Sequence, residues 1–200
     1  MAQELAGRRV AALVTHGFEE SELLEPKRAL EEAGATVDII APASGTVRGW
    51  KNHEWGDSVQ VTQTLDDVDV TDYDALLLPG GVMNPDALRM DPRAVAFVRQ
   101  MFDDGKPIAV ICHGPWTLID AGVTYGLRLT SWPSLKRDLS NAGADWVDAE
   151  VVVDRGVVSS RKPADLPAFN RKMIEEFAEG RHGGDGRGRQ PSKASVPHVA

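Results

Sequence analysis

The sequence predicts an α/β fold, in which a doubly wound, mainly parallel sheet is flanked by helices within a single domain. Three observations support this prediction. Short unbroken apolar runs, such as residues 108–111, are typical of strands covered on both faces. Longer segments with helix-start and helix-stop residues separate these runs. Because strand, helix and strand alternate along the chain, parallel strands joined by helices are the simplest arrangement.

The first part of the chain predicts two strands with a helix between them. Residues 9–15 are an apolar run and are expected to form the first strand. A helix is expected over residues 18–33, because acidic residues fill its first turns and a glycine follows it. Residues 36–41 predict the second strand. Residues 42–57 predict irregular structure or a short hairpin, and residues 59–61 predict an edge strand.

The middle of the chain repeats this pattern. Residues 74–79 are expected to be a strand that ends in the Gly80-Gly81 turn. The next predicted helix, residues 91–104, begins with Asp-Pro and ends before a glycine. Residues 108–111 then form a strand that leads directly to Cys112.

The remaining elements complete one domain. Helices are expected over residues 116–121, 134–142 and 163–179, and strands over 146–153 and 157–160 are expected to pair with each other. After residue 179 the composition changes, and few apolar residues remain that could be buried. We therefore predict an N-terminal extension over residues 1–8, one domain over 9–179 and a disordered or loosely attached tail over 180–200.

Composition and charge exclude several classes of protein. The 30 acidic and 22 basic residues give a formal net charge of −8, which opposes direct binding to nucleic acid. The apolar runs are too short to span a membrane and the polar start lacks a signal-peptide core, so we expect a cytoplasmic protein that does not bind membranes. The single cysteine excludes an internal disulfide. The five histidines show no metal-ligand spacing, so neither a metal nor another cofactor is predicted.

Cys112 is the strongest candidate for a chemical role. The strand before it ends in Cys-His-Gly-Pro, and Pro115 suits the first position of a following helix. The thiol is therefore expected in a tight turn at the carboxyl edge of the sheet. The N–H groups and partial positive charge of the helix start favour the thiolate there. The alternative is that Cys112 is a small buried hydrophobic residue.

Two other segments are expected to meet Cys112 at the same edge, namely residues 15–19 and 79–86. The Gly80-Gly81 turn lets the backbone approach a substrate, and its N–H groups, with those of the elbow that includes Gly114, are predicted to hold a developing oxyanion. An ordinary turn is the alternative. A carboxylate near the first turn is expected to reach the thiol, and the residues alone do not choose among Glu19, Glu20 and Glu22.

Other residues are candidates for the pocket, and most of them have an alternative structural role. His113 follows Cys112 directly, so its ring is expected to point away from the sulfur and to supply a proton or a positive field within the pocket. A helix-start imidazole bonded to backbone is the alternative. Asp86 is a candidate to orient His113, or a helix cap. His16 is a further pocket candidate. Three further residues either line the pocket or anchor an irregular loop, and the anchoring role is favoured. They are Trp50, His53 and Trp55.

Several separated motifs resemble one family. They are Leu78-Pro-Gly-Gly81, Val110-Ile-Cys-His-Gly-Pro115, Thr130-Ser-Trp-Pro133, Asn141-Ala-Gly143, residues 146–154 and residues 159–166. Over about residues 9–178 the chain resembles the DJ-1/PfpI superfamily, most closely its branch of PfpI-like intracellular proteases, general stress proteins and deglycases. The resemblance implies a flavodoxin-like fold, as in class I glutamine amidotransferases. Glutaminase activity is not expected, because the only histidines after His113 lie in the tail, at 182 and 198.

The resemblance also implies roles for individual residues. Cys112 would be the nucleophile, Glu19 the carboxylate hydrogen-bonded to it, and Gly81 with the backbone of Cys112 and His113 the oxyanion donors. The family's assemblies imply a homodimer or hexamer, in which Asp86 of a neighbouring subunit would pair with His113. The loop after Gly81 is about one residue longer than the family pattern, and Asp has a shorter reach than the Glu of that pattern.

Three functions remain open from the sequence. The leading one is a stress-related enzyme that uses Cys112 against reactive carbonyls such as methylglyoxal, free or as adducts on glycated proteins, in the manner of a glyoxalase or deglycase. The first alternative is an intracellular cysteine peptidase of the PfpI type. The second is a non-enzymatic oxidant sensor or chaperone that depends on oxidation of Cys112.

Overall fold

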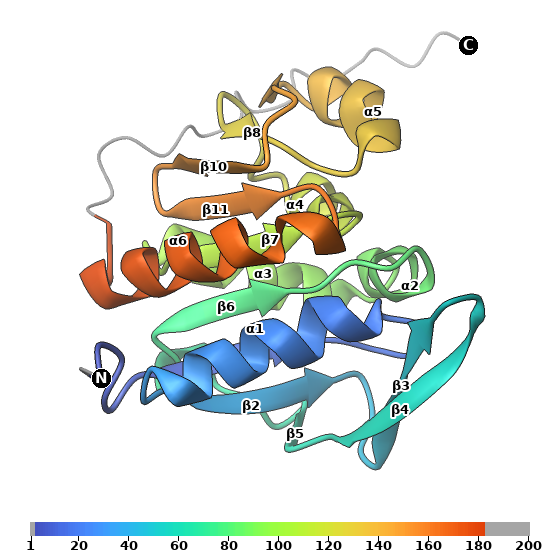
Figure 1. The fold of residues 1–200 in the computed structure, drawn as a ribbon, viewed down its shortest axis with the longest axis vertical. Helices are drawn as coiled ribbons and strands as arrows, with labels where there is room; N and C mark the ends of the chain where they lie inside the picture. The colour runs from blue at the N-terminus through green and yellow to red at the C-terminus, as the bar shows by residue number, and fades with distance from the viewer. Residues whose placement is uncertain (1–2, 183–200) are drawn as a thin grey trace, which may run out of the picture.

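A seven-stranded sheet forms the centre of the fold in the computed structural model, which describes residues 3–182 (Figure 1). All neighbouring strands in this sheet are parallel except the first two at one edge, which are antiparallel. The predicted doubly wound, mainly parallel sheet is therefore confirmed. Across the sheet the strands are β10 (Val151–Asp154), β11 (Val157–Ser160), β7 (Ile108–Ile111), β6 (Ala75–Leu78), β1 (Arg9–Leu13), β2 (Thr36–Ala41) and β5 (Gln63–Thr64).

Helices cover both faces of the sheet. Side chains alternate along each strand, so in β1 Val10 and Ala12 pack toward one face while Ala11 and Leu13 pack toward the other. The first face is covered by α1 (Glu20–Glu32) and α6 (Leu166–Glu179), and the second by α2 (Met83–Arg89), α3 (Pro92–Asp103), α4 (Pro115–Asp120) and α5 (Lys136–Asn141). Figure 1 shows α1 and α6 side by side over the first face, with α3 behind the sheet.

The order of the central strands places the predicted site. Strand β6 lies between β1 and β7 and is parallel to both, so the three carboxyl ends lie side by side. Each of these strands is followed by a segment that carries polar or glycine residues, namely 14–19, 79–82 and 112–114. Because ligands bind outside the carboxyl ends of parallel strands, this edge is the expected binding edge.

A two-stranded hairpin lies outside the main sheet, near the start of α1 (Figure 1). It consists of β3 (Thr46–Lys51) and β4 (Glu54–Gln60), so the segment predicted as irregular structure or a short hairpin, 42–57, contains most of a hairpin that extends to residue 60. The prediction of an edge strand over 59–61 is wrong, because residues 59 and 60 belong to β4. The edge of the main sheet is β5 instead.

Two further elements differ from the sequence predictions. The short helix α2 was not expected in the segment after the Gly80-Gly81 turn. The strand expected over 146–153 is interrupted, and residues 145–146 pair as β9 with β8 (Arg128–Leu129). The indole N–H of Trp146 donates to Ser131 Oγ at 2.9 Å. This bond holds Trp146 against the segment that follows β8, away from the main sheet.

Segments next to both ends of the described chain are fixed to the domain. Leu5 is fully buried, and its N–H donates to the carbonyl of Ala33 at 2.9 Å. The N–H of His182 donates to the carbonyl of Gly105 at 2.9 Å. Residues 3–8 and 180–182 therefore pack on the domain, whereas the rest of the predicted tail, from residue 183, lies outside the described residues.

None of the helices within residues 3–182 is both long enough and apolar enough to cross a membrane.

Candidate active site

Cys112 lies in a strained turn between β7 and α4. Its φ angle is +61°, a left-handed conformation that is rare for residues other than glycine. The strands around it hold this geometry, because its N–H donates to Ser160 O at 3.1 Å and its carbonyl accepts the N–H of Trp132 at 3.0 Å. Strain of this kind is typical of functional positions whose surroundings fix them. The predicted elbow is therefore present.

Glu22, rather than Glu19, is the carboxyl group next to the thiol. It is fully buried in the first turn of α1, and its side chain interacts directly with that of Cys112. Its Oε2 accepts the N–H of Gly80 at 3.0 Å, and its buried Oε1 has no hydrogen-bond partner among the described residues. Glu19 instead accepts the hydroxyl of Ser21 at 3.3 Å. The assignment of Glu19 as the thiol's partner is therefore corrected to Glu22.

Burial favours the protonated form of both Glu22 and Cys112. Burial, and then the charge of Glu19, raise the pKa of Glu22 from 4.5 to about 8. Burial and the Glu22 carboxyl also raise the pKa of Cys112, although the N–H groups of Gly81 and His113 oppose this shift. The N–H of His113 at the helix start favours the thiolate, as expected, but burial and Glu22 outweigh this effect and favour the thiol in the resting site. Desolvation outweighs the dipole of a helix as short as α4.

His113 contacts the thiol. Its Nδ1 lies 3.2 Å from Cys112 Sγ, so the prediction that the ring points away from the sulfur is wrong. Its Nε2 lies 3.4 Å from Ser134 Oγ, and its ring stacks on Trp132 with centroids 6.0 Å apart. Burial lowers the pKa of His113, which favours the neutral imidazole. A neutral ring nitrogen at this distance can accept the proton of the thiol.

The predicted oxyanion donors divide into two groups. The N–H of Gly80 is committed to Glu22, and the N–H of Gly114 donates to Ile111 O at 2.9 Å. Both glycines therefore support the site rather than bind substrate, and that part of the prediction is corrected. A side chain on Gly80 would lie 2.5 Å from Glu22 Oε2, which explains the need for glycine there. The backbone N–H groups of Gly81 and His113 face the sulfur and remain the candidate donors.

A cavity of about 460 Å³ opens over the sulfur. The hairpin contributes Trp50 and His53 to its wall, so the preference for a purely anchoring role is wrong for these two residues. Trp55 packs edge-on against Trp50, with ring centroids 5.3 Å apart, and is not part of the lining. The lining residues are Glu19, Glu22, Trp50, Asn52, His53, Gly81, Val82, Cys112, His113, Trp132 and Pro163.

Two predicted site residues lie outside this cavity. His16 is exposed, and its Nδ1 accepts the N–H of Arg48 at 3.1 Å, so it supports the hairpin instead of lining the pocket. Asp86 is exposed on α2, and its carboxylate has no partner among the described residues. Its predicted pairing with a neighbouring subunit's histidine stays a prediction.

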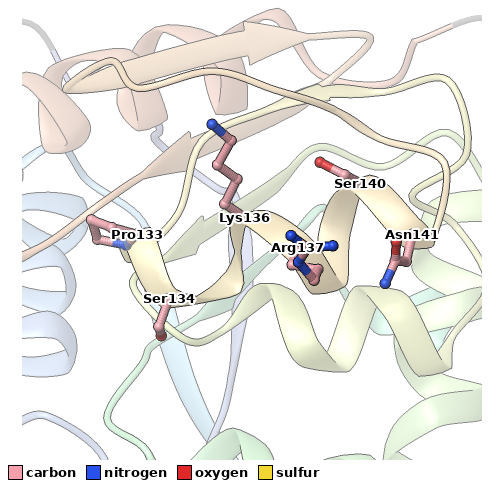
Figure 2. Close-up of a pocket in the computed structure, with 6 residues that line it drawn as sticks. All are labelled: Pro133, Ser134, Lys136, Arg137, Ser140 and Asn141. Atoms are coloured by element: carbon pink, nitrogen blue, oxygen red, sulfur yellow. The ribbon is translucent and has the colours of Figure 1, made fainter.

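A second cavity of about 370 Å³ follows α5 (Figure 2). Figure 2 shows that Ser134 and Lys136 extend to opposite sides of the backbone, so these side chains do not converge on one point. The ammonium of Lys136 lies 5.2 Å from the ring centre of Trp146. Among the residues of this cavity, Ser134 joins the active site through its contact with His113.

One group of three possible metal ligands occurs among residues 3–182, and it lies away from the site. Glu176, Glu179 and His182 are at the C-terminal end of α6. The neighbouring contact between His182 and Gly105 places this end beside the start of β7, at the edge of the sheet opposite Cys112. It therefore contributes nothing to the chemistry of the thiol.

Comparison with known proteins gives consistent matches. A sequence model described as the DJ-1/PfpI family matches residues 8–176. Deglycase PH1704 from Pyrococcus horikoshii is 47% identical over 167 residues, covering 84% of this chain and 98% of that protein. General stress protein 18 from Bacillus subtilis is 44% identical over 170 residues, covering 84% and 96%. The crystal structure of Drosophila melanogaster DJ-1beta aligns with a TM-score of 0.77 at 29% identity, covering 89% and 91%.

Proposed function

This chain belongs to the DJ-1/PfpI family, and we propose that it is a stress-related enzyme in which Cys112 attacks reactive carbonyl compounds, free or as adducts on proteins. One observation carries the proposal. The thiol lies on a strained elbow between a buried carboxyl group and a neutral imidazole, under a cavity of about 460 Å³. A protein that is 47% identical to this chain is named deglycase PH1704, and this name supports the same chemistry.

The first step follows from the protonation states. Cys112 rests as a thiol, because burial and Glu22 raise its pKa. When an aldehyde carbon approaches the sulfur, the thiol proton passes to His113 Nδ1, 3.2 Å away, as the carbon–sulfur bond forms. The aldehyde oxygen takes the electron pair of its carbonyl bond, and the N–H groups of Gly81 and His113 stabilise its charge. Proton return from His113 gives a neutral hemithioacetal.

The following steps need no external oxidant. In the methylglyoxal adduct, a proton leaves the former aldehyde carbon and another reaches the neighbouring carbon, while the hydroxyl proton of the first carbon is lost and the oxygen of the second gains one. The first carbon is thereby oxidised and the second is reduced. The result is a lactate thioester on Cys112, which water cleaves to lactate and the free thiol. Glu22 suits the proton transfers, because a group with a pKa of about 8 both releases and accepts a proton near neutral pH.

An adduct on a protein undergoes the same chemistry. In the adduct, a proton first leaves the carbon bonded to the protein's sulfur or nitrogen, another reaches the neighbouring carbonyl carbon, and the hydroxyl proton moves to the former carbonyl oxygen, which gives a lactoyl thioester or amide. Cys112 then attacks the carbonyl carbon of this lactoyl group, the protein's thiol or amine leaves with a proton, and hydrolysis of the Cys112 thioester releases lactate. The net reaction adds one water to the adduct and restores the unmodified side chain. The exposed rim of the cavity supports access by a substrate of this size, since Val82 and Trp132 are 55% and 39% exposed.

The proposal includes assembly into a homodimer or hexamer. Val82 and Met83 are exposed apolar residues at the start of α2, beside the cavity, and Asp86 follows them on the same helix. A second copy that covers this surface would bury the apolar side chains and bring its own Asp86 near the rim.

Lactate production from methylglyoxal tests the proposed function. The wild-type protein is compared with Cys112→Ser and Glu22→Gln, and casein digestion is measured on the same preparations. We expect lactate from the wild type, none above background from Cys112→Ser, and a loss of about a hundredfold or more in kcat for Glu22→Gln. Equal lactate production by Cys112→Ser, or casein cleavage that depends on Cys112 without lactate, would reject the carbonyl reaction in favour of another function.

A further inference from the structure

The imidazole of His113 has a polar partner at each of its ring nitrogens. Nδ1 lies 3.2 Å from Cys112 Sγ, and Nε2 lies 3.4 Å from the hydroxyl oxygen of Ser134. The ring also packs between two indoles. It stacks on Trp132 and meets Trp116 edge-on, with ring centroids 6.0 Å and 5.1 Å apart. These contacts fix the orientation of the imidazole, so each nitrogen keeps its own partner.

The segment that carries Ser134 is attached to the elbow of the nucleophile. The N–H of Trp132 donates to Cys112 O at 3.0 Å, and the N–H of Leu135 donates to Trp132 O at the same distance. The segment continues as a short 3₁₀ helix, η2 (Pro133–Leu135), and Leu135 is fully buried in the core. The hydroxyl is therefore presented to the imidazole by the same segment that holds the strained elbow.

The contact between Ser134 and His113 affects which nitrogen can act as a base. A neutral imidazole carries one proton, so one ring nitrogen donates and the other accepts. Nδ1 can take the proton of the thiol only when the resting proton is on Nε2. The hydroxyl oxygen of Ser134 has lone pairs that can accept a hydrogen bond from this N–H. The contact therefore favours the tautomer that the proton transfer requires.

We propose that Ser134 is a positioning residue, which holds the proton of neutral His113 on Nε2 and so leaves Nδ1 able to accept the proton of Cys112. This inference rests on the proposed function and deepens it at the same base. After the transfer the imidazolium is charged, and a charged donor forms a stronger hydrogen bond than a neutral one. Ser134 therefore stabilises the ring more after the transfer than before it, which lowers the barrier. Its own hydroxyl proton stays in place throughout.

A carboxylate from a second copy would compete for the same N–H. The predicted pairing of His113 with Asp86 of a neighbouring subunit has to use Nε2, because Nδ1 faces the thiol. Asp86 is exposed on α2, whereas Ser134 reaches the ring within one chain. Asp86→Asn is therefore compared with Ser134→Ala, to separate the two partners.

The tautomer of His113 tests the proposal without any reaction. The protein is labelled with ¹⁵N-histidine, and long-range proton–nitrogen spectra at mildly alkaline pH show which ring nitrogen carries the proton. The signals of His113 are those that disappear in His113→Asn. We expect Nε2–H in the wild type and in Ser134→Thr, which keeps the hydroxyl, and a larger share of Nδ1–H in Ser134→Ala. Nδ1–H in the wild type, or a tautomer that changes in Asp86→Asn but not in Ser134→Ala, would overturn the proposal.

The rate of lactate production gives a second readout. Ser140→Ala is the matched control, because Ser140 lines the second cavity with Ser134 but lies outside the catalytic cavity and farther along α5 (Figure 2). We expect kcat with methylglyoxal to fall about fivefold to tenfold in Ser134→Ala, with little change in KM, and to recover in Ser134→Thr. Ser140→Ala should match the wild type.

The pH profile separates positioning of the base from a general loss of structure. The hydroxyl stabilises the imidazolium, so its removal should lower the pKa of His113 beyond the effect of burial. The rise of kcat/KM with pH, which reports loss of the His113 proton, should then move to lower pH in Ser134→Ala. The other titratable groups of the cavity wall are the same in both proteins, and they are Glu19, Glu22, His53 and Cys112. A uniform fall in rate with an unshifted profile would overturn the proposal.

Failure of the proposed function is distinguishable from failure of the positioning role. If the wild type makes no lactate, the proposed function fails, and the tautomer spectra still support or overturn the role of Ser134. If lactate production depends on Cys112 but kcat is the same in Ser134→Ala as in the wild type, the proposed function stands and the positioning role is overturned.

Discussion

Three neighbouring side chains decide the reactivity of this site. Cys112 and Glu22 are both buried and both rest in the protonated form, while His113 rests neutral with Nδ1 3.2 Å from the sulfur. The sulfur is therefore activated when substrate arrives, by transfer of its proton to the imidazole. A thiol that is protonated at rest is less exposed to unspecific oxidation than a permanent thiolate.

The raised pKa of Glu22 predicts a pH dependence of stability. Its pKa is about 8 in the folded protein and 4.5 as a free side chain, so between these values the folded state holds a proton that the unfolded state has lost. Stability must then fall as pH rises from about 4.5 to about 8, and level off above that. Glu22→Gln removes this contribution. Chemical denaturation of both proteins across this range should show a shallower fall in the variant, and parallel curves would contradict the assignment.

The sequence alone located the nucleophile but not its acid. Strand, cysteine and proline in succession predicted the elbow, whereas Glu19, Glu20 and Glu22 lie within one helical turn and differ only in direction. The distinguishing signal is spacing. Glu22 falls on the buried stripe of α1 with Pro26 and Leu30, four residues apart, and a carboxyl group on such a stripe must point into the protein.

The hairpin of β3 and β4 is the element that completes the cavity. Its turn contains Asn52 and His53 with φ angles of +49° and +67°, and this tight reversal directs both residues to the cavity wall. The hairpin is attached to α1 by Glu20, whose two oxygens bind Lys51 and the N–H of Asp57. Sequence analysis left open whether this region is irregular or a short hairpin, because the alternation of apolar and polar residues is weak where most side chains are exposed.

Loss of the Glu20 contacts is expected to loosen the hairpin. Glu20→Ala removes two hydrogen bonds from a nearly buried carboxylate, so we expect a loss of about 1–3 kcal/mol in stability and a larger effect on KM than on kcat. Hydrogen exchange should accelerate in residues 46–60 more than in the main sheet. Lys51→Met, which removes one exposed partner, serves as the milder control. Unchanged exchange in the hairpin of Glu20→Ala would show that other contacts hold it.

At the scale of the whole molecule, the sequence predicted those elements whose burial sets the pattern of apolar residues. The fully buried strands β6 and β7 are unbroken apolar runs, and they were placed correctly because little else produces such runs. Short elements escaped prediction, since α2, β8 and β9 have too few residues for a periodic signal. The convergence of β1, β6 and β7 on one edge follows from strand order, and it brings together residues separated by about ninety positions in the sequence.

The central claim is that the sulfur of Cys112 forms the bond to the carbonyl substrate. Its most direct test is rapid acid quenching during turnover of methylglyoxal, followed by mass mapping of the peptide that contains Cys112. The account predicts a mass increase equal to one methylglyoxal on that cysteine, which appears during turnover and disappears when substrate is exhausted. Lactate production with Cys112 unmodified at every time point would contradict it.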